Sequence, residues 1–408
     1  MAVPGLLYPE ETPLSRSNHQ GAAILNDFRD GYPAVLREPL RPGPAWFRGD
    51  LHMQSAHSDG QCPSQTGTMV PCPVFFTVDA SARRGLDFIA ITDHNASSQY
   101  DAMRELQPYF DKVLLIPGRE ITTFQGHLNF LGTTSYVDFR LGSKTVPDMN
   151  TLLRNADRLG ALVSINHPDA PSGEICMGCG WTPASPVDMH LLAAVEAVNG
   201  GSESHGFNGI PFWDKQLNNG YRLTGIGGSD NHNATAPLDE PSSVGSPTTV
   251  VYAANLSTPA ILAGIRAGHV FIDLTASPNR MLTMNATAGG NSASMGDVLA
   301  APKGTAVNFE ITETGAHHGP DQIPDQIPDQ IPDQIKVTLI EDGREVSGLS
   351  QPKPSASGES CHFTWTSDGY RHWFRPQVTG PDGKLWLLGN PIYIDWTSPA
   401  APSGPAAR

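Results

Sequence analysis

Short apolar runs alternate with stretches of helical spacing over the first two thirds of the chain. The runs are five to seven residues long and cover residues 46–52, 88–92, 113–117, 127–131, 161–166, 194–198 and 223–227. Between several of them, apolar residues follow helical spacing, in residues 78–84, 101–106, 149–159 and 259–267. Such alternation is typical of βα units. The sequence therefore predicts an α/β fold with a mainly parallel sheet or barrel.

The pattern changes near residue 296. Five further strand candidates, residues 307–313, 335–341, 362–365, 372–378 and 385–394, are separated by turn signals such as Asp342-Gly343 and Asp382-Gly383. No convincing helical spacing lies between them, which favours a small β-sandwich. We therefore predict three parts: an N-terminal extension over 1–44, an α/β domain over 45–290 and a C-terminal β-sandwich over 296–398.

One repeat interrupts the predicted sandwich. The unit Pro-Asp-Gln-Ile occurs four times over residues 320–335. A four-residue unit is too short for a solenoid, and its recurring proline removes backbone donors. The repeat therefore predicts an expanded surface loop without chemistry.

The composition is that of a globular protein. Of 408 residues, 39% are hydrophobic and 16% charged, and the formal net charge is −15. This balance argues against non-specific binding to nucleic acid or to an anionic membrane. No apolar run has the length of a membrane span, and the first residues do not resemble a secretory signal, so we expect a cytoplasmic protein. A secreted chain with its signal removed would look the same, and homo-oligomer formation stays open.

The cysteines do not suggest a disulfide framework. There are five, Cys62, Cys72, Cys176, Cys179 and Cys361, and an odd number favours reduced thiols. Cys176 and Cys179 have the spacing of half a zinc site, but no second such pair accompanies them. We therefore expect loop thiols.

Metal-binding residue types gather where the predicted strands of the α/β region end. They are Asp50, His52, Gln54, His57, Asp59, Asp93, His94, Glu120, His127, His167, Glu196, Asn199, Asp230 and His232. In a barrel, the carboxyl ends of the strands form one face, so these side chains would converge. One histidine after a strand is usually structural, but six with several acids favour a site for zinc, manganese or iron.

Taken in order, these motifs resemble the PHP (polymerase and histidinol phosphatase) family, and most closely its CehA/McbA-like branch, named for carbaryl hydrolases. The resemblance covers residues 46–285, and residues 389–393 resemble the end of that branch's β-domain. It implies a distorted seven-stranded β/α (TIM-like) barrel, in agreement with the strand pattern. It also implies two or three divalent metal ions.

The resemblance implies a set of metal ligands. They are His52, Asp59, His94, Glu120, His127, His167, Asp230 and His232. Glu120 would bridge two of the ions. Position 54 departs from the family, which usually has histidine there; Gln54 is a weaker, neutral ligand or a substrate contact. The first of the three ion positions would then be weaker, empty or completed by another group.

Catalytic roles follow from the same resemblance. Glu120 would hold a pair of ions that activate a shared water. Acids for the leaving group or substrate contacts would come from His57, Arg119 and His205. Arg119 would grip a phosphate or, alternatively, pair with a barrel carboxylate. Asp50, Asp93, Glu196 and Asn199 are expected to support the ligands by hydrogen bonds.

The bond that is cleaved stays open at this point. The wider family implies a small-molecule phosphoester, whereas the carbaryl-hydrolase branch implies an aryl carbamate or carboxylester. Few cations lie at the strand ends, while the segment after Asp59 is rich in apolar residues such as Phe75 and Phe76. An apolar mouth suits an organic ester, although these residues could equally pack the loops. A non-catalytic metal-binding module is the third alternative.

Overall fold

The computed structural model describes residues 39–174, 176–200, 208–237, 240–315, 334–346, 351–354, 358 and 360–396. Pro39–Arg408 form one compact unit. The predicted N-terminal extension lies outside the described residues up to position 38, as does the candidate His205.

The fold is mixed α/β, with a large sheet of parallel and antiparallel strand pairs. Seven neighbouring strands of this sheet coincide with the seven predicted apolar runs: β1 (Ala45–Asp50), β4 (Phe88–Ile91), β5 (Leu114–Thr123), β6 (Gly126–Leu131), β7 (Leu162–Ile165), β8 (Ala194–Asn199) and β9 (Thr224–Gly228). We call them the seven-strand run. Neighbours pair in parallel, except that β6 is antiparallel to both β5 and β7. The expectation of a mainly parallel sheet therefore fails at β6.

The first and last strands of the seven-strand run approach each other just beyond the carboxyl end of each strand. An isolated parallel bridge joins Met53, after β1, to Asn231, after β9. The Asn231 carbonyl accepts a hydrogen bond from Gln54 N at 2.8 Å, and the His52 carbonyl accepts one from Asp230 N at 2.9 Å. The loops after the first and last strands are thus held side by side.

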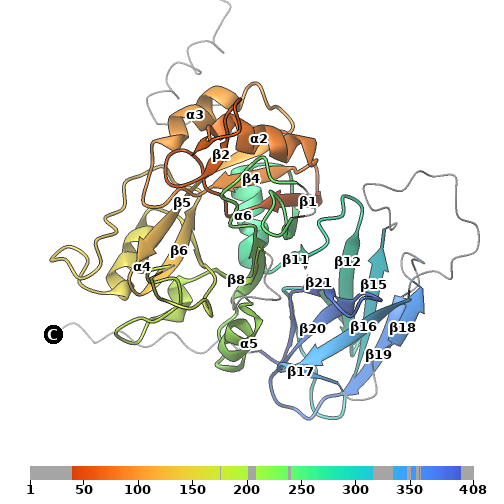
Figure 1. Ribbon diagram of the computed structural model, residues 1–408. Helices are drawn as coiled ribbons and strands as arrows, with labels where there is room; N and C mark the ends of the chain where they lie inside the picture. The colour runs from red at the N-terminus through yellow and green to blue at the C-terminus, as the bar shows by residue number, and fades with distance from the viewer. Residues whose placement is uncertain are drawn as a thin grey trace, which may run out of the picture. The chain divides into compact units, whose positions relative to one another are not determined.

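Four helices match the predicted helical stretches: α2 (Val74–Arg83), α3 (Gln99–Leu106), α4 (Met149–Arg158) and α6 (Thr258–Ala267). Helices α2 and α3 lie next to each other beside β4 (Figure 1). The Asp148 side chain caps α4, and Ser257 caps α6, which ends at Gly268 with φ +75°. Helix α5 (Ile210–Asn218) and the short helix η2 (Met189–Leu191) were not predicted.

Two strands that were not predicted extend the sheet. β10 (Thr248–Ala253) pairs antiparallel with β1, and β11 (Val270–Asp273) pairs with β10. A strand of the predicted sandwich, β21 (Leu385–Gly389), pairs antiparallel with β11 and so joins the same sheet. The large sheet thus runs without interruption from the α/β region into the C-terminal region.

The C-terminal region contains a second sheet and the end of the first. The four-stranded sheet comprises β12 (Met281–Ala288), β13 (Asn291–Ser294), β15 (Ala306–Thr314) and β19 (Ser360–Thr366). The large sheet adds β14 (Val298–Leu299), β16 (Gln334–Glu341), β17 (Arg344–Glu345), β18 (Gln351–Pro354), β20 (His372–Thr379), β21 and β22 (Ile392–Ile394). Buried residues of both sheets, including Phe309, Leu339 and Phe374, form one apolar core. Because β12 starts at Met281, this region begins before the predicted boundary at 296.

Asn390 connects the last strands to the seven-strand run. Its Oδ1 accepts a hydrogen bond from Gly225 N of β9 at 2.8 Å. Its Nδ2 donates to the carbonyls of Gly225, at 2.8 Å, and Val270 of β11, at 2.9 Å. The buried amide thus satisfies backbone groups of two strands that do not pair directly.

The predicted Pro-Asp-Gln-Ile loop falls mostly outside the described residues. Its last two residues, Gln334 and Ile335, begin β16, and the Ile335 side chain is buried in the C-terminal core. The end of the repeat is therefore part of a strand rather than of a loop.

The expectation of reduced loop thiols is wrong for four of the five cysteines. Cys62 pairs with Cys72 and Cys176 with Cys179, with Cα atoms 4.9 Å and 5.6 Å apart. These separations lie in the range of disulfides. The hairpin of β2 (Gln61–Pro63) and β3 (Met69–Pro71) brings the first pair together. Cys361 is free and buried.

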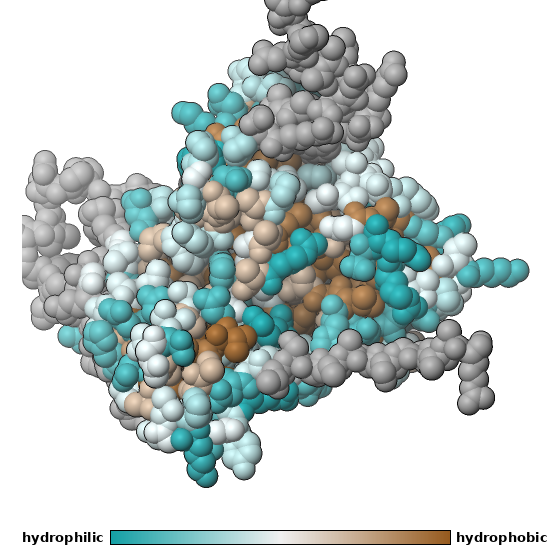
Figure 2. Space-filling model, turned by 180° about the vertical axis from the view of Figure 1, so that it is seen from behind, coloured by the Kyte–Doolittle hydropathy of each residue, from teal (hydrophilic) through white to brown (hydrophobic). Residues whose placement is uncertain are grey.

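Apolar side chains are also exposed. Figure 2 shows brown apolar areas set among polar side chains on the face opposite to that of Figure 1. Phe124 and Met177, with 78% and 64% of their surface exposed, are among the large apolar residues of this kind. In the described part of the chain, no helix combines the length and the apolarity needed to cross a membrane.

Candidate metal centre

The seven-strand run brings the predicted metal ligands to one edge. His52, His94 and Asp230 follow β1, β4 and β9, at carboxyl ends that share this edge. The reversed direction of β6 explains His127, which begins its strand and yet reaches the same edge. Glu120 lies within β5, which continues past its neighbours to Thr123.

The Glu120 carboxylate lies among four imidazoles. Oε2 is 3.1 Å from His52 Nε2 and 2.9 Å from His94 Nδ1. Oε1 is 3.1 Å from His127 Nδ1 and 3.5 Å from His167 Nε2. Glu120 and His52 are completely buried, and His127 and His167 nearly so. One carboxylate therefore contacts four of the predicted ligands with both of its oxygens.

Three groups of side chains at this edge place three donor atoms within 4.8 Å of one another. The first contains His52, His167 and Asp230; the second contains Asp59, His94 and His232; the third contains His127, His167 and Cys179. All members of the first two groups are among the ligands that the family resemblance implies. The first and third share His167, and the third includes a cysteine that the sequence analysis did not assign to the site.

Neighbouring carboxylates and imidazoles shift one another's pKa values in the site. Burial favours the neutral form of Glu120, but the charge of His52 and the hydrogen bond from His127 hold its pKa well below its ordinary value. Burial disfavours the charged form of His52, yet Asp230 and two buried glutamates raise its pKa well above the ordinary value. The pKa of His232 is raised to about 9, because nearby carboxylates outweigh its burial. A divalent cation would take the place of such protons, so this donor set fits a metal.

Two of the predicted ligands adopt backbone conformations that are unusual for residues other than glycine. His167 has φ +25° and Asp230 has φ +53°. Such conformations cost about 1–3 kcal/mol each and are found at functional sites. Hydrogen bonds hold both residues in place, from His167 N to Glu196 Oε2 at 3.0 Å and from Asp230 N to the His52 carbonyl at 2.9 Å.

Glu196 and Asn199 form hydrogen bonds with the predicted ligands. Glu196 Oε1 lies 2.7 Å from His52 Nδ1, while Oε2 accepts from His167 N and from Asn199 Nδ2, each at 3.0 Å. A carboxylate on Nδ1 leaves Nε2, the nitrogen that faces Glu120, as the ligand atom. Asn199 Nδ2 also lies 3.4 Å from Asp230 Oδ2.

Asp50 and Asp93 hold the surrounding loops. Buried Asp50 accepts hydrogen bonds from the backbone N–H groups of His52, Ser229 and Gly245, at 3.2, 3.1 and 2.7 Å. Asp93 was expected to orient His94 or a neighbouring ligand. It instead accepts from Ser55 N and Oγ, at 2.8 and 2.7 Å, and from the Ser58 hydroxyl at 2.7 Å. Both aspartates thus position the loop after β1.

Gln54 lies in the site, with its amide nitrogen toward Glu120. Nε2 donates to Glu120 Oε2 at 2.8 Å, and Oε1 lies 3.1 Å from the Ser58 hydroxyl, whose proton goes to Asp93. Asn166, which was not predicted, donates to the other oxygen of Glu120 at 3.1 Å. Gln54 thus serves Glu120 as a hydrogen-bond donor in this arrangement.

Arg119 and His57, two predicted catalytic residues, do not contact the Glu120 carboxylate as four of the predicted ligands do. Arg119 neighbours Glu120 in β5, and successive side chains of a strand point to opposite faces. Its guanidinium lies 5.8 Å from the centre of the Tyr100 ring of α3 and donates to the Ser135 carbonyl at 3.3 Å. The expected substrate contact by Arg119 does not fit this placement. His57 is partly exposed, and its Nδ1 lies 2.7 Å from Ser98 Oγ.

Cys179 and Asn166 are the residues of the site that sequence reasoning missed. Asn166 immediately precedes His167 at the end of β7, so its position at a strand end was a usable signal. Cys179 lies in the loop that follows, twelve residues after His167, and nothing in its spacing indicates that the loop returns to the strand ends.

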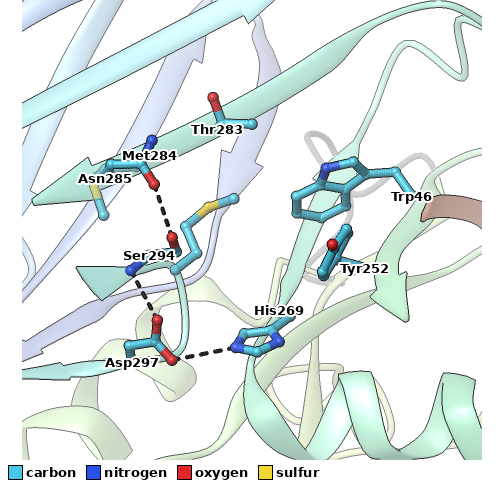
Figure 3. Close-up of a pocket in the computed structure, with 9 residues that line it drawn as sticks. Trp46, Tyr252, His269, Thr283, Met284, Asn285, Ser294 and Asp297 are labelled. Atoms are coloured by element: carbon cyan, nitrogen blue, oxygen red, sulfur yellow. Dashed lines mark hydrogen bonds and ion pairs between the residues drawn. The ribbon is translucent and has the colours of Figure 1, made fainter. Parts of the chain in front are cut away.

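A cavity of about 370 Å³ shares no residue with the metal centre. The rings of Trp46 and Tyr252 form one wall with centroids 5.4 Å apart, and His269 pairs with Asp297 at 3.3 Å on another (Figure 3). That ion pair is too small a donor set for a metal centre. The donor groups described above lie at the strand ends instead.

No protein-family model matches the sequence, and no curated protein matches it. Among solved structures, a two-domain protein from Bacteroides vulgatus containing a predicted PHP-like metal-dependent phosphoesterase is 16% identical over 86% of this chain and 95% of that one, with a TM-score of 0.46. A structure from Bifidobacterium adolescentis, described as a metal-dependent phosphoesterase, is 15% identical over 48% and 92%, with a TM-score of 0.32. A lesion-specific endonuclease from Pyrococcus furiosus is 12% identical over 64% and 60%, with a TM-score of 0.33. Because all three TM-scores are below 0.5, the residues of the site carry the functional argument.

Proposed function

We propose that the protein is a PHP-type metal-dependent hydrolase that cleaves a phosphoester. The observation that carries this proposal is the position of Glu120, whose two oxygens contact four imidazoles at distances of 2.9 to 3.5 Å. A buried carboxylate shared by so many histidines is the arrangement expected of a bridging ligand between metal ions.

The seven-strand run supports the fold that the resemblance implies. An isolated bridge between Met53 and Asn231 joins the loops after its first and last strands, which supports closure of the run at this edge. We infer a distorted seven-stranded barrel with its site at one face, followed by a β-sandwich built from the C-terminal strands.

The residues of the site divide the chemical work. Divalent ions, two or three of zinc, manganese or iron, would activate a water and polarise the ester when bound. Glu120 would hold them close together, and Glu196 keeps His52 in the tautomer that binds through Nε2. His57, whose Nδ1 is fixed by Ser98, is the candidate proton donor to the leaving group.

An aryl carbamate or carboxylester is the second candidate substrate. Phe124 and Met177 are largely exposed, and the Met177 carbonyl lies 3.3 Å from His127 Nε2. Gly178 packs against Phe124, so both exposed side chains belong to segments bordering the metal centre. Apolar side chains at the mouth favour an aryl group in the substrate.

The test combines metal analysis of the purified full-length chain with a panel of aryl phosphates, phosphodiesters, aryl carbamates and carboxylesters. We expect phosphoester turnover to fall at least about a hundredfold in His167→Ala, because a ligand shared by two donor groups is lost. His190→Ala is the matched control, since His190 packs on Tyr221 outside the three donor groups. Turnover of carbamates alone would favour the second candidate. A fully metallated protein that cleaves none of the panel would refute the proposal.

A further inference from the structure

Cys179 belongs to one of the three donor groups, although the sequence predicted only a loop thiol without a role in the site. Its Sγ and one nitrogen each of His127 and His167 lie within 4.8 Å of one another. All three residues are buried, with Cys179 only 1% exposed. A buried thiol beside two imidazoles has the composition of a zinc ligand set.

The loop after β7, residues 168–174 and 176–181, holds Cys179 against the site. Trp181 N donates to the Pro168 carbonyl at 2.8 Å, which closes the loop on itself. The Trp181 ring packs on Gly126, the residue before His127. Gly178 has φ +78°, and a Cβ there would collide with the Thr123 carbonyl. Only glycine therefore allows this close approach just before Cys179.

The thiol makes this group different from the other two. The donor groups around Asp230 and Asp59 consist of imidazole and carboxylate, which suit zinc, manganese and iron alike. A thiolate is a softer ligand and selects zinc or cobalt over manganese. The donor group that contains His127 would therefore prefer different metal ions from those preferred by the other two groups.

The structure also pairs this sulfur with Cys176, whose Cα lies 5.6 Å away. Cys176 is partly exposed, whereas Cys179 is buried. A sulfur in a disulfide is no longer the anionic thiolate that binds a metal, so Cys179 cannot bind a metal while it is bonded to Cys176. Solvent can reach the pair through Cys176.

We propose that the Cys179 thiolate is a ligand, with His127 and His167, for a thiophilic divalent ion, and that the disulfide with Cys176 removes it. A small-molecule disulfide, R–S–S–R, would supply the oxidation. The Cys176 thiolate attacks one sulfur and releases RS⁻, and the Cys179 thiolate then attacks Cys176 and releases a second RS⁻. Two thiolates enter and two leave, so electrons and atoms balance. This inference rests on the proposed function only in assigning metal to this edge.

The experiment follows the bond between sulfur and metal directly. The full-length Cys62→Ser/Cys72→Ser protein, which lacks the other disulfide, is reduced with a phosphine, freed of metal and titrated with cobalt(II). We expect a near-ultraviolet thiolate-to-cobalt charge-transfer band. The band should be absent after Cys179→Ser, with cobalt affinity lowered at least about tenfold, and present after Cys176→Ser.

Glutathione disulfide tests the switch. It should abolish the band and release about one equivalent of cobalt from the parent protein, but leave both unchanged in Cys176→Ser, which keeps the ligand and cannot form the disulfide. A reduced protein without the band, a band that survives Cys179→Ser, or equal loss from Cys176→Ser would overturn the inference. If Cys179→Ser fails to fold, the comparison of the parent with Cys176→Ser still decides it. A band without ester turnover would contradict the proposed function alone.

Discussion

Replacing Glu196 by glutamine should weaken metal binding without removing a ligand. The buried carboxylate of Glu196 accepts from His52 Nδ1 at 2.7 Å with one oxygen, and from His167 N and Asn199 Nδ2 at 3.0 Å with the other. An amide of the same shape has only one acceptor oxygen. One of these two sets of donors must therefore face an NH₂ group.

Either orientation of the new amide is unfavourable. If its NH₂ faces His167 N and Asn199, buried donors lose their acceptor at about 1–3 kcal/mol each. If its NH₂ faces His52 Nδ1, the imidazole proton moves to Nε2, the atom 3.1 Å from Glu120 and 3.2 Å from Asp230. That tautomer cannot bind a metal through Nε2. We expect a 10–100-fold loss of metal affinity, about 1.4–2.8 kcal/mol.

The assay is equilibrium dialysis against zinc with metal analysis, accompanied by urea denaturation of the metal-free proteins. Asp214→Asn is the matched control, because the half-buried Asp214 carboxylate pairs with Arg375 at 3.2 Å and belongs to none of the donor groups. This control should lose stability and keep its metal affinity. Unchanged zinc affinity in Glu196→Gln, or an equal loss in Asp214→Asn, would refute the reasoning.

Three further predictions concern single residues. Gln54→His should bind metal about tenfold more tightly or take up one more equivalent, because imidazole replaces a neutral amide beside Glu120; unchanged metal content would contradict a weakened position. Arg119→Lys should lower the free energy of unfolding by about 1 kcal/mol, through its contacts with Tyr100 and Ser135, and leave KM unchanged; a raised KM for phosphoesters would place Arg119 at the substrate. The pKa of His372 is raised because hydrogen bonds and charges of Asp342 and Asp368 outweigh its burial. A histidine whose pKa is raised in the folded state contributes its full stabilisation of the fold below about pH 6.5. This contribution is lost as the pH rises through the pKa of the folded state. His372→Gln should therefore lower Tm more at about pH 6 than at about pH 9, and an equal shift at both would disprove this account.

The strands of the seven-strand run could be predicted because each contains a short, buried apolar run. β4 and β7, for example, are four consecutive buried residues, and the polar side chains that follow them mark where they end. The direction of β6 could not be predicted, because a short apolar run reads the same in either direction. β10 and β11 were missed because the helical spacing of residues 258–267 between them dominated that part of the sequence.

The site was predictable only where ligands lie on or beside strands. His52 and Asp230 follow strand ends that share one edge, and Glu120 lies within β5 at the same edge. Cys179 could not be found, because its place depends on the course of a loop fixed by Gly178 and Trp181 rather than on a periodic pattern. Arg119 was misplaced although the signal was present, since alternation along β5 already directs it away from the face of Glu120.

The amide of Asn390 has a consequence for the order in which the chain can mature. During synthesis, β9 and β11 leave the ribosome long before residue 390, and until then the N–H and C=O of Gly225 lack the partner that they have in the finished fold. β11 likewise waits for β21 before its outer edge is paired. The large sheet therefore cannot be completed until residues 385–390, near the end of the 408-residue chain, have emerged, and until then β9 and β11 keep exposed backbone groups that are paired in the folded protein.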